Sequence, residues 1–351
     1  MSGHTGIILA PLGTLYGAVT RARLALYRAG ALTVQRVSSP VISVGNITTG
    51  GAGKTPLVEW IARALAQRGE RVCILTRGYG REKPGSRVLV SDGMRILADA
   101  RTGGDEPLLL AETLGGVAVV SDADRVAAAR WAAQSLQSSV FVLDDGFQYL
   151  RLARELNLVA IDATNPWGGS RLLPRGRLRE PLKELKRADC LVITRAEQVQ
   201  DTESLRKQVE RLSGGRPVLV SRTRIKGAQL LAETPNASAP VEMPQALAAF
   251  CAVGNPPAFF AQARLAGYTL NLTRAFRDHH FYAQSEMDAL VAEAGRLGAR
   301  ALLTTAKDAV KLRSLRLDLP CYVLRTEVEF EDEAKMLGMI DEALQARTRL
   351  A

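Results

Sequence analysis

The chain has 351 residues, 47% of them hydrophobic and 23% charged, a balance typical of a globular protein large enough for two domains. Its formal net charge of +10 fits nucleic acid, an anionic membrane surface or a phosphorylated substrate, but with only 5% aromatic residues no platform for single-stranded nucleic acid is indicated. The four cysteines and three histidines lack metal-ligand spacing, so we expect buried free thiols in a reducing cytoplasm.

The first predicted element is a helix over residues 12–29, in which apolar side chains are mixed with Arg21, Arg23 and Arg28. Two interpretations are open: an amphipathic helix lying in a membrane interface, or a helix packed against its own domain. No run of about 18 or more apolar residues occurs, and the N-terminal pattern is not that of a secretory signal. The sequence therefore predicts neither a transmembrane helix nor secretion.

The next predicted element, at residues 41–60, is a strand followed by a glycine-rich loop and a helix. This order is typical of a P-loop, in which backbone N–H groups and a helix N-terminus bind phosphate. Lys54 would reach the β- and γ-phosphates, and the Thr55 hydroxyl would hold Mg²⁺. The alternative is an ordinary glycine-rich turn, and Thr48 stands where the strict pattern has glycine. The predicted nucleotide-binding residues are Thr48, Thr49, Gly50, Gly51, Ala52, Gly53, Lys54 and Thr55.

Apolar strands then alternate with amphipathic helices, which predicts an α/β fold with a largely parallel sheet covered on both faces. Ligands in such sheets bind at the carboxyl ends of the strands. Strands are predicted at 72–76, 87–90, 116–121, 140–143, 156–161 and 191–194, with helices at 54–68, 105–114, 123–135 and 197–213.

Residues 223–246 lack helical periodicity and are predicted to connect two domains, with extended segments and a turn at Pro235 and Asn236. A smaller α/β unit follows. Its predicted strands are 248–253, 269–273, 301–304 and 321–324, and its predicted helices are 256–266, 284–297 and 331–347.

Two pairs of acidic residues are candidates for chemistry. Asp144 and Asp145 end an apolar strand as in a Walker B motif, where they would meet the Mg²⁺ held by Thr55, although an Asp-Gly turn alone is the simpler alternative. Asp105 and Glu106 open a predicted helix. Asp105 is either only a helix N-cap or a group that faces the γ-phosphate as a base or metal partner.

Basic groups and histidines follow other predicted strands. His279 lies beside a carboxylate, and such a pair can relay or orient a proton, or it can be purely structural. Arg77, Arg171 and Arg175 belong to basic loops that contain glycine, and guanidinium groups bind phosphates in bidentate fashion. A loop for a substrate phosphate or headgroup is one interpretation of these arginines, and solvated charge is the other.

Together these motifs resemble the tetraacyldisaccharide 4'-kinase family, the lipid A 4'-kinases of Gram-negative bacteria. The resemblance covers nearly the whole chain and implies a P-loop NTPase-like α/β/α sandwich joined by a β-linker to a second, smaller α/β domain. It implies a membrane-associated helix at 1–30, a P-loop kinase domain at 31–222, a linker at 223–246 and the smaller domain at 247–351. The motifs are VGNITTGGAGKTP, TRGYGR, GGDEPLLLA, VLDDGFQ, RLLPRGRLREP, FCAVGNPPAFF, FRDHHFY and TTAKDAVKL.

The resemblance implies ATP- and Mg²⁺-dependent phosphorylation of the 4'-hydroxyl of a tetraacylated glucosamine disaccharide 1-phosphate, a lipid A precursor. It implies a peripheral protein on the cytoplasmic face of the inner membrane, with no nucleic-acid partner and no evident obligate protein partner. The implied catalytic residues are Lys54, Asp105 as the base and His279 as its support. The implied metal site is formed by Thr55, Asp144, Asp145 and Glu106, and the implied substrate contacts are Arg77, Arg171 and Arg175.

Three departures from the family pattern are visible. Tyr149 stands where the family has histidine, Ala306 replaces a carboxylate, and Arg175 and Arg177 stand where smaller residues are usual. One rival interpretation is a GTPase in which residues 305–308 read guanine, and another is a basic nucleic-acid-binding ATPase.

Overall fold

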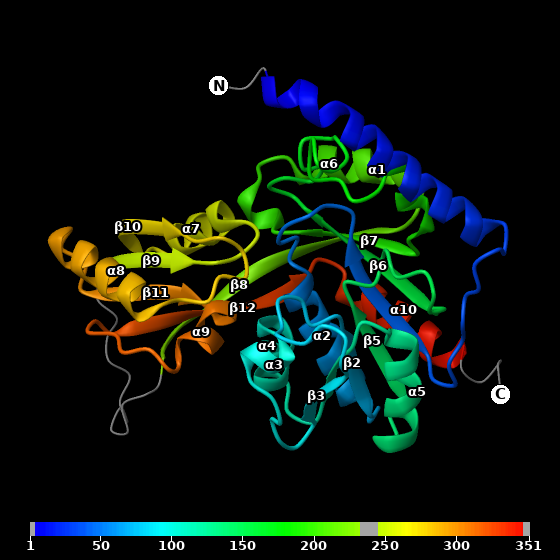
Figure 1. Cartoon of the computed structure of the whole chain (residues 1–351), viewed down its shortest axis with the longest axis horizontal. Coiled ribbons are helices and arrows are strands. Elements are labelled where there is room, and N and C mark those ends of the chain that lie inside the picture. Colours follow the sequence, from blue (N-terminus) through cyan, green and yellow to red (C-terminus); the bar gives the residue numbers. More distant parts are fainter. Residues whose placement is uncertain (1–3, 232–244, 347–351) are drawn as a thin grey trace.

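The computed structural model describes residues 4–231 and 245–346, so the predicted turn at Pro235 and Asn236 lies outside the described residues. Twelve strands form one continuous sheet in the order β10-β9-β11-β12-β8-β7-β6-β1-β5-β2-β4-β3 (Figure 1). The strands are β1 (Val41–Asn46), β2 (Val72–Thr76), β3 (Val88–Asp92), β4 (Ala118–Ser121), β5 (Val140–Asp144), β6 (Leu156–Asp162), β7 (Cys190–Thr194), β8 (Val218–Leu230), β9 (Ala246–Cys251), β10 (Thr269–Ala275), β11 (Ala301–Thr305) and β12 (Cys321–Phe330).

Helices cover this sheet on both faces. The α-helices are α1 (His4–Arg28), α2 (Lys54–Gln67), α3 (Ala100–Gly103), α4 (Asp105–Thr113), α5 (Arg125–Ser135), α6 (Thr202–Ser213), α7 (Pro256–Leu265), α8 (Gln284–Arg296), α9 (Ala306–Leu312) and α10 (Glu333–Gln345). Two short 3₁₀ helices, η1 (Leu182–Arg187) and η2 (Ala196–Gln198), lie on either side of β7 in the sequence.

Strands β1 to β7 form what we call the P-loop half, in which all neighbours are parallel except the edge strand β3. Alternate residues of its strands point to opposite faces, as Val142 and Leu143 of β5 do. One face packs against α2, α4 and α10, and the other against α5, η1 and α6. This half is therefore the expected α/β/α sandwich.

The second half contains β9 to β12. Strands β10, β9, β11 and β12 run parallel, with α8 packed on one face and α7 on the other. Strand β8 joins the halves because its first residues pair with β7 and the rest pair with the antiparallel strand β12. The predicted extended connection thus coincides in part with β8, while the exact domain boundaries stay a prediction.

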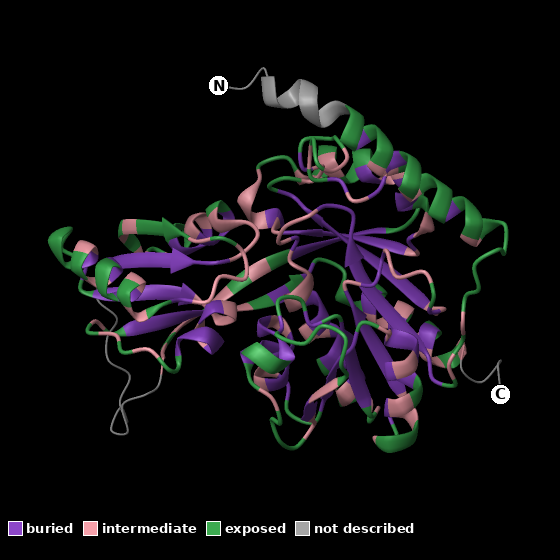
Figure 2. Cartoon of the chain, viewed as in Figure 1, coloured by how far each residue is buried: buried purple, intermediate pink, exposed green. Residues whose placement is uncertain are grey.

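Several elements differ from the sequence-based expectation. Helix α10, predicted as part of the smaller unit, instead packs Met336 and Ile340 into the core of the P-loop half, where Asp341 pairs with Arg68 of α2. Helix α9 was not predicted, and β12 is longer than the predicted segment 321–324. Strands β1, β2, β4, β5, β6 and β7 are buried throughout, as Figure 2 shows, whereas β8 and β12 carry exposed residues beyond their first four buried ones.

Helix α1 lies along the outside of the P-loop half (Figure 1). Its Tyr16 hydroxyl donates to the Arg179 carbonyl at 2.9 Å, and its Arg28 pairs with the buried Glu184 at 2.7 Å. Its exposed apolar residues are Leu12, Leu15, Val19 and Leu26. The helix therefore packs on its own domain and also presents apolar side chains to solvent. In the described part of the chain, no helix has the length and apolar character needed to cross a bilayer.

Gly45 provides a test of how the P-loop strand meets the segment after β5. A Cβ at Gly45 would lie 2.5 Å from both the Cβ and the backbone N of the fully buried Phe147, so Gly45→Ala must displace that segment. We expect a loss of about 1–3 kcal/mol in the free energy of unfolding. Gly338→Ala in α10, which meets open space, should instead be neutral or stabilising by up to about 1 kcal/mol. Equal denaturation midpoints for the two variants would contradict this packing.

Candidate active site

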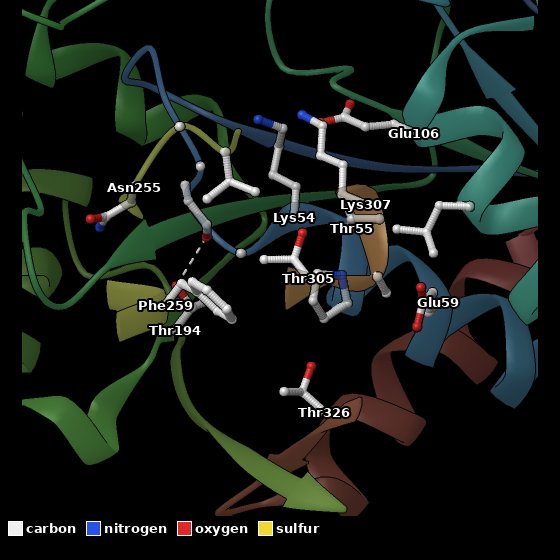
Figure 3. Close-up of a pocket in the computed structure, with 18 of the residues that line it drawn as sticks. Lys54, Thr55, Glu59, Glu106, Thr194, Asn255, Phe259, Thr305, Lys307 and Thr326 are labelled. Carbon is white, nitrogen blue, oxygen red and sulfur yellow. Dashed lines mark hydrogen bonds and ion pairs between the residues drawn. The ribbon is translucent and has the colours of Figure 1, made fainter. Parts of the chain in front are cut away.

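The loop between β1 and α2 has the geometry of a phosphate-binding loop. Gly50 has a φ of 109° and Gly53 a φ of 72°, in the region that favours glycine. Thr48 needs no such freedom because it forms an isolated bridge with Leu178, which explains why a threonine is accommodated at this position. Thr194 at the end of β7 donates to the Ala52 carbonyl at 3.0 Å and so fixes the loop (Figure 3).

Lys54 opens α2 and points towards the carboxylate at the end of β5. Its ammonium donates to Asn46 Oδ1 at 3.0 Å and lies 3.4 Å from Asp145, which also accepts from Arg179 at 2.7 Å. Burial alone would raise the pKa of Asp145, but the charges of Lys54 and Arg179 hold that pKa well below its ordinary value. Asp145 also has a φ of 51°, a strained conformation of the kind found at functional sites.

Asp144 differs from its neighbour because none of the described ion pairs includes it. Burial and the nearby Glu106 carboxylate raise the pKa of Asp144 to about 7 although Lys54 opposes them. A divalent cation at this position would relieve the repulsion between the two carboxylates. Among the described residues, no three His, Cys, Asp or Glu side chains form a metal cluster, so a cation here would need hydroxyl and phosphate ligands as well.

Asp105 and His279 meet across the two halves of the sheet. His279 Nδ1 lies 2.9 Å and 3.0 Å from the two carboxylate oxygens of Asp105, whose side chain is 3% exposed. Burial would raise the pKa of Asp105, but the hydrogen bond from His279 and the charge of Lys307 lower it. Gly104, not Asp105, is the N-cap of α4, although Asp105 Oδ1 also accepts from the backbone N–H of Glu106 at 2.9 Å. His279 has a φ of 61°, again in the strained region.

Two lysines of α9 surround this pair. Lys307 donates to Glu106 at 2.9 Å and to Asp278 at 3.1 Å, and Figure 3 shows its ammonium at the Glu106 carboxylate. Lys311 is fully buried, 2.9 Å from Asp308 and 3.7 Å from Asp105. The sequence predicted neither lysine as a site residue, because TTAKDAVKL indicated only a family motif and a candidate guanine-reading element. Glu106, predicted as a metal ligand, is here paired with a cation.

A loop of the second half lies directly on the P-loop. A Cβ at Gly254 would be only 2.3 Å from Gly51 N. Next to it, Asn255 donates to Asp162 at 2.8 Å and to Thr164 at 3.0 Å, both at the end of β6. The carboxyl ends of β9 and β6 therefore meet at the phosphate-binding loop.

These segments enclose a cavity of about 1350 Å³ that contains the predicted nucleotide-binding residues and Glu106, Asp144, Asp145 and His279. Of the predicted substrate arginines, only Arg77 lines it. Arg171 and Arg175 are exposed outside it, while Arg179, which was not assigned to the site, pairs with Asp145 inside it. Lys54 and Asp145 could be predicted because Lys54 follows the glycine-rich loop after β1 and Asp145 directly follows the apolar strand β5. Arg179 follows no strand, so the sequence carried no comparable signal for it.

Tyr149 and Ala306, two of the positions that depart from the family pattern, have structural explanations. Tyr149 donates to Asp124 at 3.1 Å and stacks under Arg125, and Ala306 packs among Leu108 and its neighbours. Asp308 is fully buried and accepts hydrogen bonds from Ala252 N and the Tyr282 hydroxyl, so it cannot present its carboxylate to a guanine base. This geometry argues against the GTPase interpretation.

The fold and this site define a P-loop protein whose phosphate-binding loop faces an acid–histidine pair formed between the two halves of the sheet. The family model for tetraacyldisaccharide-1-P 4'-kinase matches residues 5–345. The chain belongs to this family and is a kinase.

Similar proteins agree over nearly the full length. The tetraacyldisaccharide 4'-kinase of Geobacter metallireducens is 39% identical over 96% of this chain and 98% of its own, and that of Anaeromyxobacter sp. strain Fw109-5 is 41% identical over 88% and 84%. The crystal structure of LpxK from Aquifex aeolicus in complex with ATP superposes with a TM-score of 0.75 at 31% identity, covering 97% of this chain and 99% of that one.

Gly254→Ala tests the contact between the second half and the P-loop. Alanine is compatible with the backbone at this position, where φ is not positive, so the only expected effect is the clash of its Cβ with Gly51 N and with Gly50 Cα at 2.7 Å. We expect kinase activity to fall by at least about tenfold, because displacement of this loop also displaces His279. Gly295→Ala in α8, where a Cβ meets open space, should retain activity. Wild-type activity in both variants would contradict the contact.

Proposed function

We propose that this chain transfers the γ-phosphate of ATP to the 4'-hydroxyl of a tetraacylated glucosamine disaccharide 1-phosphate, which gives lipid IVA in lipid A biosynthesis. The observation that carries this proposal is the Asp105–His279 pair, whose histidine lines the same cavity as the P-loop lysine. A carboxylate oriented by a histidine is suited to accept the proton of an attacking hydroxyl. The family membership supplies the identity of that hydroxyl.

In this proposal the hydroxyl attacks the γ-phosphorus in line while Asp105 accepts its proton. Lys54 balances the negative charge on the phosphoryl oxygens, and Asp145 and Asn46 hold its ammonium in place. Thr55 and the buried Asp144 would hold Mg²⁺, which neutralises phosphate charge when bound. Asp145 and Glu106 fit a direct metal contact less well, because each is already paired with a cation.

The predicted substrate arginines and the N-terminal helix extend the proposal to the substrate phosphate and the membrane surface. Arg77 lines the cavity and is placed for a substrate phosphate, whereas the side chain of Arg175 lies against Gly13 of α1. Arg171 and Arg175 are therefore better placed for anionic headgroups at a membrane surface. The protein would bind the cytoplasmic face of the inner membrane peripherally, through the exposed apolar residues of α1.

The transfer reaction can be measured with labelled γ-phosphate and the tetraacyl disaccharide 1-phosphate in detergent micelles. Wild type should form labelled lipid in a Mg²⁺-dependent reaction, and Lys54→Ala should abolish product. Asp105→Ala should lower turnover at saturating substrates by about 10²–10⁴, the usual contribution of a general base.

Arg313→Gln is a suitable control for these variants, because Arg313 pairs with Glu112 at 2.7 Å outside the cavity. It should retain near-normal turnover. Near-normal turnover in Asp105→Ala would show that Asp105 is not the base, and folded, ATP-binding wild type without lipid product would refute the proposed acceptor.

Membrane binding is tested by placing a charge in the exposed apolar face of α1. Leu15→Asp removes an apolar group that is 62% exposed, so sedimentation with anionic phospholipid vesicles should fall several-fold. Leu265→Asp on α7 alters a side chain that is 65% exposed and should leave vesicle binding unchanged. Equal losses in both variants would remove α1 as the docking element.

A further inference from the structure

His279 is bound on both of its ring nitrogens. Nδ1 faces the Asp105 carboxylate at 2.9 Å, and an ionised carboxylate only accepts, so Nδ1 carries a proton. On the opposite edge, Nε2 lies 3.4 Å from the ammonium of Lys307. An ammonium has three donors and no acceptor, so Nε2 must offer its lone pair. These two partners together select the Nδ1–H tautomer of the neutral ring over the Nε2–H tautomer. Burial lowers the pKa of His279, but the hydrogen bond with Asp105 and the charges of Asp105 and Glu106 together outweigh burial and raise that pKa above its ordinary value, so the neutral ring is observed at mildly alkaline pH.

Lys307 is itself held in one position. Its three ammonium protons match three acceptors: Glu106 at 2.9 Å, Asp278 at 3.1 Å and His279 Nε2 at 3.4 Å. Asp278 is 3.8 Å from Nε2, too far for a hydrogen bond that would favour a proton there. The side chain of Lys307 is only 12% exposed, so water competes little for these contacts.

We propose that Lys307 is a positioning residue that locks His279 in its neutral Nδ1–H tautomer, so that His279 orients the carboxylate of Asp105 and does not relay its proton. This inference rests on the proposed function, in which Asp105 is the base. A relay would require Nε2 to release or accept a proton, and Lys307 occupies that nitrogen. The proton taken from the acceptor hydroxyl therefore stays on Asp105 until product leaves.

The placement of Lys307 explains why a site on the P-loop half needs the second half. Lys307 follows β11 and His279 follows β10, whereas Glu106 and Asp105 open α4 of the other half. One ammonium thus joins a carboxylate of the first half to the histidine of the second. The lysine and the histidine can reach Glu106 and Asp105 only when the two halves meet.

The tautomer is directly measurable by long-range ¹H–¹⁵N NMR of the full chain labelled at histidine, because the sequence has only three histidines. His279→Gln identifies the His279 signals by their loss. His280 serves as an internal reference for the other tautomer, in which Nε2 carries the proton. Its Nε2 lies 2.8 Å from Glu286 and donates to that carboxylate. At mildly alkaline pH, wild type should show His279 with a protonated Nδ1 and an unprotonated Nε2.

Lys307→Met keeps the aliphatic stem but removes the donor. We expect the His279 signals to move towards a tautomer mixture or the imidazolium, with His280 unchanged. Turnover should fall about 10- to 100-fold, as for a misplaced catalytic group, with little change in the KM for ATP. Lys307→Arg retains N–H donors and should recover part of the turnover. Arg313→Gln, directly after the same helix and paired with Glu112 of α4, should alter neither readout.

The wild-type spectrum alone can overturn the proposal, if His279 is an imidazolium or carries its proton on Nε2. A folded Lys307→Met variant with unchanged His279 signals would overturn it as well, even if turnover fell. These NMR results can be distinguished from a failure of the proposed function, which is measured by lipid phosphorylation. Absence of lipid product, or full turnover in Asp105→Ala, would refute the kinase assignment or the base while the spectrum still reports on Lys307.

Discussion

Asp105 and His279 are 174 residues apart in the sequence, yet they meet at 2.9 Å, and the rest of the site depends on this contact. Neither half of the sheet contains a complete site: the P-loop half supplies the lysine and the carboxylates, and the second half supplies the histidine and Lys307. Strands β8 and β12 join the halves so that β9, β10 and β11 direct their carboxyl ends at the carboxyl ends of β1 and β5.

Charge in the cavity is nearly balanced residue by residue. Asp145 is neutralised by Lys54 and Arg179, and Glu106 by Lys307, so these carboxylates are held in place as anions. Two lining carboxylates, Asp144 and Glu59, belong to none of the described ion pairs. The pKa of Asp144 rises to about 7 through burial and the charge of Glu106, and burial raises the pKa of Glu59 to about 7. Asp144 lies beside Asp145 at the end of β5, so it is the carboxylate where a bound cation would relieve charge repulsion most.

The sequence predicted the parts of this structure that depend on local rules. The strand, glycine loop and helix at residues 41–60 identified Lys54 and Thr55, and the position of Asp144 and Asp145 after an apolar strand identified the opposite wall. The pairing of Asp105 with His279 came from family resemblance, because no local rule relates the two. Lys307 was missed since its partners Glu106, Asp278 and His279 lie far from it in the sequence, and α10 was misplaced since its apolar face fits either core.

The most direct test of this two-part site is a double-mutant cycle on turnover with Asp105→Asn and His279→Gln. If His279 acts only by orienting Asp105, the histidine substitution should cost little once the carboxylate is gone. The double variant should then be about as slow as Asp105→Asn alone. Additive losses, with the double variant slower by the product of the two single effects, would show that the two residues act independently and would contradict the account.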